Sequence, residues 1–171
     1  MRASRRLNVL GTAHALEFAR RCGGLERFVY FSTDEVFGPA AFGTKYWEWD
    51  RYRSQNPYAV TKAGGEELAL AHANTHGLPV IVTHTMNCFG ERQHREKFIP
   101  KVIRAVLDGE VVPIHPDPTK KVPGSRHYIH ARNVAAAILF LLERVKEHRS
   151  SGARSSTWSG SARSITWRWR G

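Results

Sequence analysis

Short apolar runs alternate with longer amphipathic segments along the middle of this chain, and this alternation is what most restricts its fold. Residues 27–32 and 80–85 are rich in β-branched and aromatic side chains, which predicts two buried strands. Between them, Pro57 opens a helix that continues to about His76 and ends at Gly77. Because strands that alternate with helices form layered sheets, we expect an α/β fold.

Other segments complete this layout. Apolar positions at helical spacing predict three further helices, at residues 8–22, 98–107 and 132–146. Glycine, proline and polar residues predict loops at residues 36–56, 87–96 and 116–126. A short strand is expected at residues 111–115. The 171 residues amount to one domain.

The two ends of the chain differ from its middle in charge. The net charge is +11, but five arginines follow the last acidic residue, Glu147, and three more lie among the first six residues. We therefore divide the chain into a basic N-terminal extension (1–7), an α/β core (8–147) and a tail rich in Ser, Arg and Trp (148–171). The tail has no apolar periodicity, so we expect it to be disordered. Its composition is typical of a shifted reading frame, although tryptophans among arginines can also stack on RNA.

Composition also bears on location and partners. The chain has no run of about 18 apolar residues, so we expect no membrane-spanning helix. The basic start is not followed by an apolar segment, which argues against a secretory signal. Cys22 and Cys88 are too far apart to suggest a disulfide framework. His72 and His76 lack further ligands at metal spacing. We expect a cytoplasmic protein without a metal site, and nucleic-acid binding is disfavoured.

Two motifs carry the chemistry. Tyr58 and Lys62 are four residues apart on a predicted helix and so share one face. The ammonium would favour the phenolate, so the tyrosine could act as a base near neutral pH. Ser32-Thr33-Asp34-Glu35 follows the first predicted strand, at the end where parallel sheets bind ligands. Together the motifs predict redox and proton-transfer chemistry on a hydroxylated substrate.

Each motif also has a purely structural interpretation. Tyr58 and Lys62 could be an ordinary helix pair. Asp34 and Glu35 could be turn residues, as acids that follow a strand often are. The occurrence of both motifs in this order favours catalysis.

These segments resemble the extended short-chain dehydrogenase/reductases, and among them the NAD-dependent sugar-nucleotide epimerase/dehydratases. The resemblance runs from about Asn8 to Glu143 and is carried by NVLGTAHALEFAR, FVYFSTDEVFG, NPYAVTKAGGEEL, GLPVIVTHTMNCFGERQHREKFIPKVI and GSRHYIHARNVAAAI. Thr-Asp-Glu at positions 33–35 is similar to the nucleotide-sugar 4,6-dehydratases of this family. The resemblance implies NAD as the cofactor and a nucleotide-diphosphate sugar as the substrate.

The resemblance also implies roles for the catalytic residues. Tyr58 would take the proton of the sugar 4-hydroxyl, while Lys62 would hold the nicotinamide ribose. Thr33 would hydrogen-bond the sugar. Glu35 would remove the C5 proton, and Asp34 would protonate the departing 6-hydroxyl.

Further residues match binding positions of the family. Ser32, with Tyr58 and Lys62, is expected at the cofactor. Asn87, Lys97 and Arg126 are expected near the substrate diphosphate; taken alone, Asn87 could begin a turn and Arg126 could be a surface charge. A homodimer could form through the helix at residues 57–76, by a face that comprises Ala69, Leu70 and Ala73.

The chain also departs from the family. The family's dinucleotide pyrophosphate lies on a Gly-x-x-Gly-x-x-Gly turn at a helix N-terminus. None of the 14 glycines forms that pattern, and Asn8 matches a point well inside the dinucleotide-binding half. The resemblance fades near Lys146. We therefore expect a partial Rossmann-like, doubly wound parallel sheet without the N-terminal glycine-turn half, marginal in stability and weak in NAD binding. A different epimerase/dehydratase, or an inactive fragment of one, is the alternative.

Overall fold

The structure is a computed structural model that describes residues 2–40, 45–114, 116, 121, 126–150 and 163–166. It divides into two compact units, one within residues 1–85 and 142–171 and the other within residues 86–141. In chain order the elements are α1 (Arg2–Arg5), the π-helix η1 (Arg6–Gly11), α2 (Thr12–Arg21), β1 (Phe28–Thr33), the 3-10 helix η2 (Asp34–Phe37), α3 (Pro57–His76), β2 (Val80–Thr85), β3 (Asn87–Phe89), α4 (Phe98–Leu107), β4 (Tyr128–His130), α5 (Ala131–Ser150) and β5 (Arg163–Thr166).

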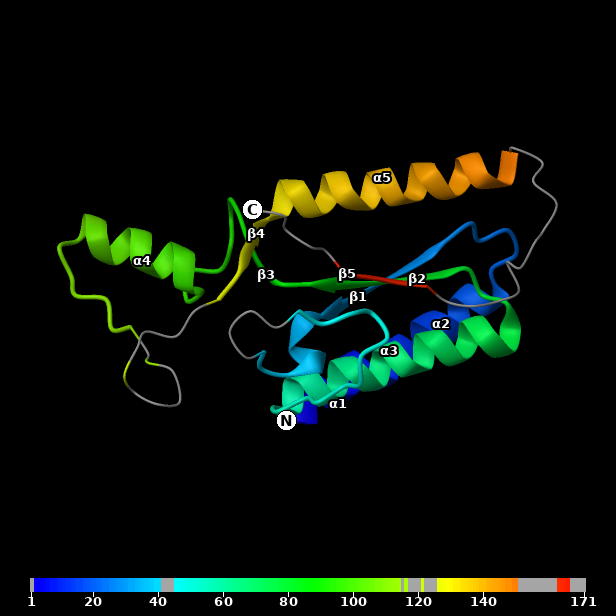
Figure 1. Cartoon of the computed structure of the whole chain (residues 1–171), viewed down its shortest axis with the longest axis horizontal. Coiled ribbons are helices and arrows are strands. Elements are labelled where there is room, and N and C mark those ends of the chain that lie inside the picture. Colours follow the sequence, from blue (N-terminus) through cyan, green and yellow to red (C-terminus); the bar gives the residue numbers. More distant parts are fainter. Residues whose placement is uncertain are drawn as a thin grey trace. The chain divides into compact units, whose positions relative to one another are not determined.

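The first unit is built on a parallel sheet with the strand order β1-β2-β5 (Figure 1). β1 and β2 pair in register from Phe28 opposite Val80 to Thr33 opposite Thr85. α3 connects these two strands, as a parallel pair requires. The predicted α/β fold with parallel strands is confirmed.

Local signals define α3. The Asn56 side chain accepts a hydrogen bond from the Ala59 amide at 2.8 Å, which satisfies a free N–H at the start of the helix. Pro57 occupies the first helical position, where its missing N–H has no cost. Gly77 ends the helix with a φ of 66°, a left-handed conformation that favours glycine. The helix therefore has the bounds that the sequence predicts.

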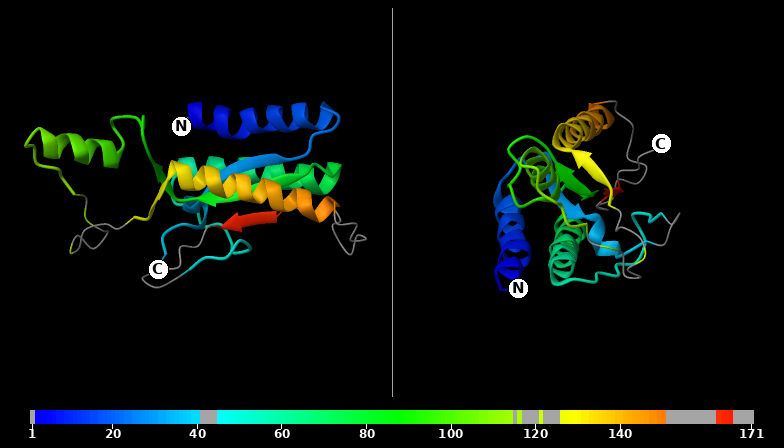
Figure 2. Two further views of the ribbon diagram at one scale, coloured as in Figure 1. Left: turned by 90° about the horizontal axis from the view of Figure 1, so that it is seen from above. Right: turned by 90° about the vertical axis from the view of Figure 1, so that its left-hand side faces the viewer.

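The main core lies between this sheet and the helices α2 and α3, which Figure 2 shows side by side. Its buried members are Leu16, Ala19, Tyr30, Ala69, Ala73, Leu78, Val80 and Val82. Ala69 and Ala73 are at most 1% exposed, so the helix face expected to form a dimer contact is already covered by the chain's own core. That part of the sequence-based prediction is wrong, because the small residues serve close helix packing within the chain.

The N-terminal helix is longer than predicted. Helical structure begins at Arg2 rather than at Asn8 and includes the π-helical turn η1. This turn packs on α3, where the Asn8 amide donates to the Thr61 hydroxyl at 3.0 Å. A side chain at Gly65 would collide with the Asn8 carbonyl oxygen and the Tyr30 hydroxyl. The close approach of the two helices therefore depends on this glycine.

The second unit contains β3, β4 and α4. β3 and β4 form a two-stranded parallel sheet, with Asn87 opposite Tyr128 and Phe89 opposite His130. The strand at residues 87–89 was expected to be loop, whereas residues 111–114, expected as a strand, have no strand structure. Whether such a segment forms a strand depends on pairing with a segment about 40 residues away, which the local sequence does not reveal.

The described part of the tail also differs from expectation. α5 continues to Ser150, and Arg163–Thr166 pairs as β5 with β2 instead of being disordered. The rest of the predicted disordered tail, residues 151–162 and 167–171, lies outside the described residues. Within the part of the chain that the structure describes, no helix is long and apolar enough to cross a membrane.

Candidate active site

The carboxyl end of β1 presents the predicted acids on a short helix. The Thr33 hydroxyl accepts a hydrogen bond from the Glu35 amide at 3.3 Å and so caps η2. Asp34 and Glu35 form the first turn of η2 and are only partly buried. Val36 and Phe37 follow them with at most 1% exposure. The two buried side chains fix η2, and the two carboxyl groups remain accessible.

Asn56 links these acids to the start of α3. Its side-chain amide donates to Glu35 Oε2 at 2.7 Å, while its oxygen caps the helix at Ala59. The same residue therefore joins the strand-end acids to the helix that carries Tyr58 and Lys62. The sequence analysis placed Asn56 in a loop and gave it no role, although Asn before Pro is a recognisable helix-start signal.

Replacing Asn56 with alanine should lower the free energy of unfolding by about 1 kcal/mol, because a helix cap is lost. Urea titration followed by circular dichroism measures this change. The matched control is Gln55→Ala, at the exposed neighbouring position, which should leave the midpoint nearly unchanged. Equal midpoints for Asn56→Ala and the unmodified chain would show that the cap does not stabilise α3.

The side-chain ammonium of Lys62 contacts β1 rather than the phenol of Tyr58. Its Nζ donates to the Phe31 carbonyl at 2.5 Å and lies 4.5 Å from the centre of the Tyr30 ring. Burial lowers the pKa of Lys62, and the negative charge of Glu66 opposes this effect. The Tyr30 hydroxyl donates to the Lys62 carbonyl at 3.0 Å. The lysine is thus held against β1 by both its backbone and its side chain.

Tyr58 is accessible, with 46% of its surface exposed. Its pKa is raised above the ordinary value by burial, and then by the charges of Glu35 and Asp34. The expectation that Lys62 lowers this pKa is therefore wrong, because the ammonium is hydrogen-bonded to β1 and the charges that act on the phenol are negative. The negative charges of both carboxyl groups therefore disfavour the phenolate.

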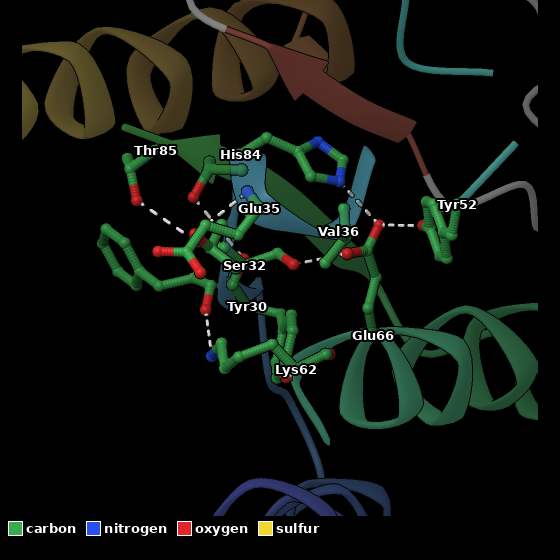
Figure 3. Close-up of polar contacts among 12 residues, drawn as sticks. Tyr30, Ser32, Glu35, Val36, Tyr52, Lys62, Glu66, His84 and Thr85 are labelled. Carbon is green, nitrogen blue, oxygen red and sulfur yellow. Dashed lines mark hydrogen bonds and ion pairs between the residues drawn. The ribbon is translucent and has the colours of Figure 1, made fainter. Parts of the chain in front are cut away.

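Ser32 faces α3 and is 4% exposed. Its hydroxyl donates to Glu66 Oε2 at 2.5 Å, so it is engaged by a carboxylate that the sequence analysis did not single out (Figure 3). Its expected place at the cofactor stays a prediction. Glu66 follows Lys62 by one helical turn, and an acid on the buried face of a helix is the signal that could have revealed it.

The residues predicted for the diphosphate lie in the second unit. The Asn87 amide donates to the His127 carbonyl at 3.2 Å. Lys97 and Arg126 are exposed, and Lys97 stands at the start of α4. The structure therefore brings together Thr33–Glu35, Tyr58 and Lys62 within the first unit, while the diphosphate residues stay predictions.

The second unit also contains a pocket of about 840 Å³ between the segment after β3 and α4. Arg92, Arg95 and Arg104 line it, and Glu91 and Asp108 contribute acids. None of the three residues predicted for the diphosphate is among its lining residues. Arginines suit anionic ligands, and the sequence analysis assigned these residues no role.

Comparison with known proteins decides the family. The model of the "NAD dependent epimerase/dehydratase family" matches residues 3–153. The chain belongs to this family. The chain is 45% identical over 112 residues to a dTDP-glucose 4,6-dehydratase of Streptomyces griseus. The match covers 66% of this chain and 34% of that relative. The predicted family is confirmed.

Two further members illustrate the range of the family. The chain is 38% identical over 141 residues to a trifunctional UDP-glucose 4,6-dehydratase/UDP-4-keto-6-deoxy-D-glucose 3,5-epimerase/UDP-4-keto-L-rhamnose-reductase of Arabidopsis thaliana, covering 80% of the chain and 20% of that protein. A crystal structure of dTDP-glucose 4,6-dehydratase from Bacillus anthracis in complex with NAD superposes with a TM-score of 0.72 at 25% identity, over 96% of this chain and 57% of that one. The Rossmann-like fold is thereby confirmed, and the chain spans well under two thirds of each relative's length.

Proposed function

We propose that this chain carries the catalytic part of an NAD-dependent nucleotide-sugar 4,6-dehydratase, which converts NDP-glucose to NDP-4-keto-6-deoxyglucose. The observation that carries the proposal is the pair of adjacent acids, Asp34 and Glu35, at the carboxyl end of β1, where Glu35 is hydrogen-bonded to Asn56, the cap of the helix that carries Tyr58. An epimerisation needs a base at C4, whereas an elimination of water also needs a proton acceptor and a proton donor. The names of the relatives from Streptomyces griseus and Arabidopsis thaliana support this choice.

The acids and the phenol have separate tasks in this proposal. Tyr58 takes the proton of the sugar 4-hydroxyl as that carbon is oxidised. Glu35 then removes the C5 proton, which the 4-ketone has acidified. Asp34 protonates the 6-hydroxyl, which leaves as water. Their surroundings differ, because Glu35 accepts a hydrogen bond from Asn56 and Asp34 accepts one from the Thr33 hydroxyl at 3.3 Å. Different environments are what allow two carboxyl groups to take opposite protonation states.

The residues fit the nicotinamide end of NAD. Tyr58 is half exposed, and Lys62 presents a half-buried ammonium at the carboxyl end of β1, where ligands of parallel sheets bind. These two side chains would hold the nicotinamide ribose. When bound, NAD⁺ accepts a hydride from C4 and returns it to C6. The glycine turn for the pyrophosphate is not in this sequence, so we expect weak binding.

The substrate is proposed to be a nucleotide-diphosphate sugar. Asn87, Lys97 and Arg126 would contact its diphosphate, for which guanidinium and ammonium groups are suited. dTDP-glucose and UDP-glucose are the candidates, since both occur in the names of relatives. A homodimer and a cytoplasmic location stay predictions from the sequence.

The test is a product assay with purified protein, saturating NAD⁺, and dTDP-glucose or UDP-glucose. We expect a nucleotide sugar lighter by one water that carries a 4-ketone, detected by mass spectrometry. The matched variants are Glu35→Gln, which should abolish the product, and Glu48→Gln, a partly buried acid of the loop that follows η2, which should not. A 4-epimer of unchanged mass would favour the epimerase alternative. Folded protein that makes neither product would overturn the proposal.

A further inference from the structure

A buried carboxylate at Glu66 joins several segments of the first unit. Glu66 is fully buried and accepts hydrogen bonds from three described residues: Ser32 of β1 at 2.5 Å, His84 Nε2 of β2 at 2.9 Å, and the hydroxyl of Tyr52 (Figure 3). His84 is 1% exposed. The carboxylate therefore links α3, two strands and the segment that precedes α3.

The network fits an ionised Glu66. Burial by itself raises the pKa of Glu66, but the hydrogen bond and charge of His84 and the donors Ser32 and Tyr52 outweigh it, and the pKa is lowered. A buried charge is costly unless it is paired and hydrogen-bonded. Because an ionised carboxyl group only accepts, the Nε2 of His84 carries the hydrogen. Each donor is thus held in a single orientation.

The hydrogen-bond network around Glu66 contacts the chain on both sides of Asp34 and Glu35. Ser32 immediately precedes Thr33 and is bonded to Glu66 directly. Phe37, the last residue of η2, is 1% exposed and packs on the rings of His84 and Tyr52, with ring centres 4.8 and 5.6 Å apart. The ring nitrogen Nε2 of His84 and the hydroxyl of Tyr52 both donate to Glu66. The carboxylate therefore holds the chain on either side of Asp34 and Glu35.

The same residue lies on the catalytic helix. Glu66 follows Lys62 by four residues and Tyr58 by eight, so the three side chains project from successive turns of one side of α3. A displacement of Glu66 relative to β1 would change the separation between the acids and the phenol. Through Ser32, Tyr52 and His84, Glu66 connects the Tyr58–Lys62 helix to the chain on both sides of η2.

We propose that Glu66 is a positioning residue for the dehydratase reaction, whose carboxylate sets the place of Asp34 and Glu35 relative to Tyr58. This inference rests on the proposed function, because it concerns the geometry of that reaction. Glu66 does not touch the reacting atoms in this proposal. It acts through Ser32 on one side of η2 and through His84 and Tyr52 on the other.

The experiment compares Glu66→Gln with Glu67→Gln in the full chain. Glu67 is the adjacent, exposed acid and is the matched control. The readout is the pKa of Tyr58, followed by NMR titration of ring-labelled tyrosine and assigned with Tyr58→Phe. The charges of Glu35 and Asp34 raise this pKa. Ser32→Ala, which leaves the Glu66 charge in place, separates movement of the two acids from loss of that charge, because movement changes the pKa of Tyr58 in both variants.

We expect Glu66→Gln to lower the pKa of Tyr58 toward its ordinary value and Glu67→Gln to leave it in place. Glu66→Asp, which keeps the charge, should retain part of the elevation. A folded Glu66→Gln protein with an unchanged Tyr58 pKa would overturn the proposal, because a merely structural role alters only stability. If Glu66→Gln does not fold, Ser32→Ala replaces it, because this variant removes one donor and leaves the carboxylate in place. An unchanged Tyr58 pKa in folded Ser32→Ala would then overturn the proposal.

Activity supplies the second readout. In a chain that makes the keto product, Glu66→Gln should reduce kcat at least tenfold with little change in KM, because binding groups are retained. A change in KM with an unchanged kcat would contradict a positioning role for Glu66. If the unmodified chain makes no product, the proposed dehydratase function fails, while the Tyr58 titration still decides whether Glu66 positions the acids.

Discussion

Replacing Tyr58 with phenylalanine should reduce formation of the 4-keto product by about 10²- to 10⁴-fold, the usual contribution of a positioned acid–base group. The substitution removes the hydroxyl and keeps the ring. Because the ring is 46% exposed, the core is not disturbed and the melting temperature should stay nearly constant. The loss should appear mainly in kcat, since proton transfer occurs in the transition state rather than on binding.

Tyr46→Phe is the matched control for Tyr58→Phe. The Tyr46 hydroxyl donates to the Pro39 carbonyl at 2.9 Å in the loop that follows η2. This variant should retain full product formation. Rates measured by mass spectrometry with saturating substrate compare the two proteins directly. If Tyr58→Phe keeps a rate within threefold of the unmodified chain, another group is the base and the catalytic assignment is lost.

Gly65→Ala should lower the free energy of unfolding by about 1–3 kcal/mol, the usual cost of forcing atoms into a packed interior. The new methyl group would collide with the Asn8 carbonyl oxygen and the Tyr30 hydroxyl. Neither partner can easily move, because one is backbone and the other is bonded to the Lys62 carbonyl. The helix propensity gained by replacing glycine, at most about 1 kcal/mol, does not offset this overlap.

Gly64→Ala separates the overlap from helix propensity. It lies one position earlier on α3, where an added methyl group would meet Val9 Cγ2 at 3.6 Å, an ordinary contact. This variant should be as stable as the unmodified chain or up to about 1 kcal/mol more stable. Denaturant titrations of both variants give the comparison. Equal stabilities for the two alanine variants would refute the close approach of η1 and α3.

Where signals are local, the sequence predicted the structure closely. α3 has its expected bounds because Pro57 and Gly77 act on the backbone within one turn. The two strands at residues 28–33 and 80–85 were recognised from their apolar content, which burial on both sides of a parallel sheet requires. The residues of the two motifs lie at a strand end and on one helix face, as their spacing predicts, and their catalytic role stays a prediction.

Segments whose structure depends on distant partners were not predicted. β3 and β5 are strands only because β4 and β2 pair with them, and short polar segments carry little signal of their own. The start of the first helix at Arg2 likewise depends on packing against α3. The environment of Tyr58 was misjudged because the sequence does not show that Lys62 binds the Phe31 carbonyl.

By itself, the sequence determined that the chain folds as a parallel α/β protein, and it predicted that Tyr58, Lys62 and the acids at 34–35 belong to one site. Only the tertiary structure decided how that site is held, because Ser32, Tyr52 and His84 meet the Glu66 carboxylate from positions up to 34 residues away from it in the chain. The physical reason is that periodicity and spacing report a residue's own element, whereas the partner of a buried charge is set by folding.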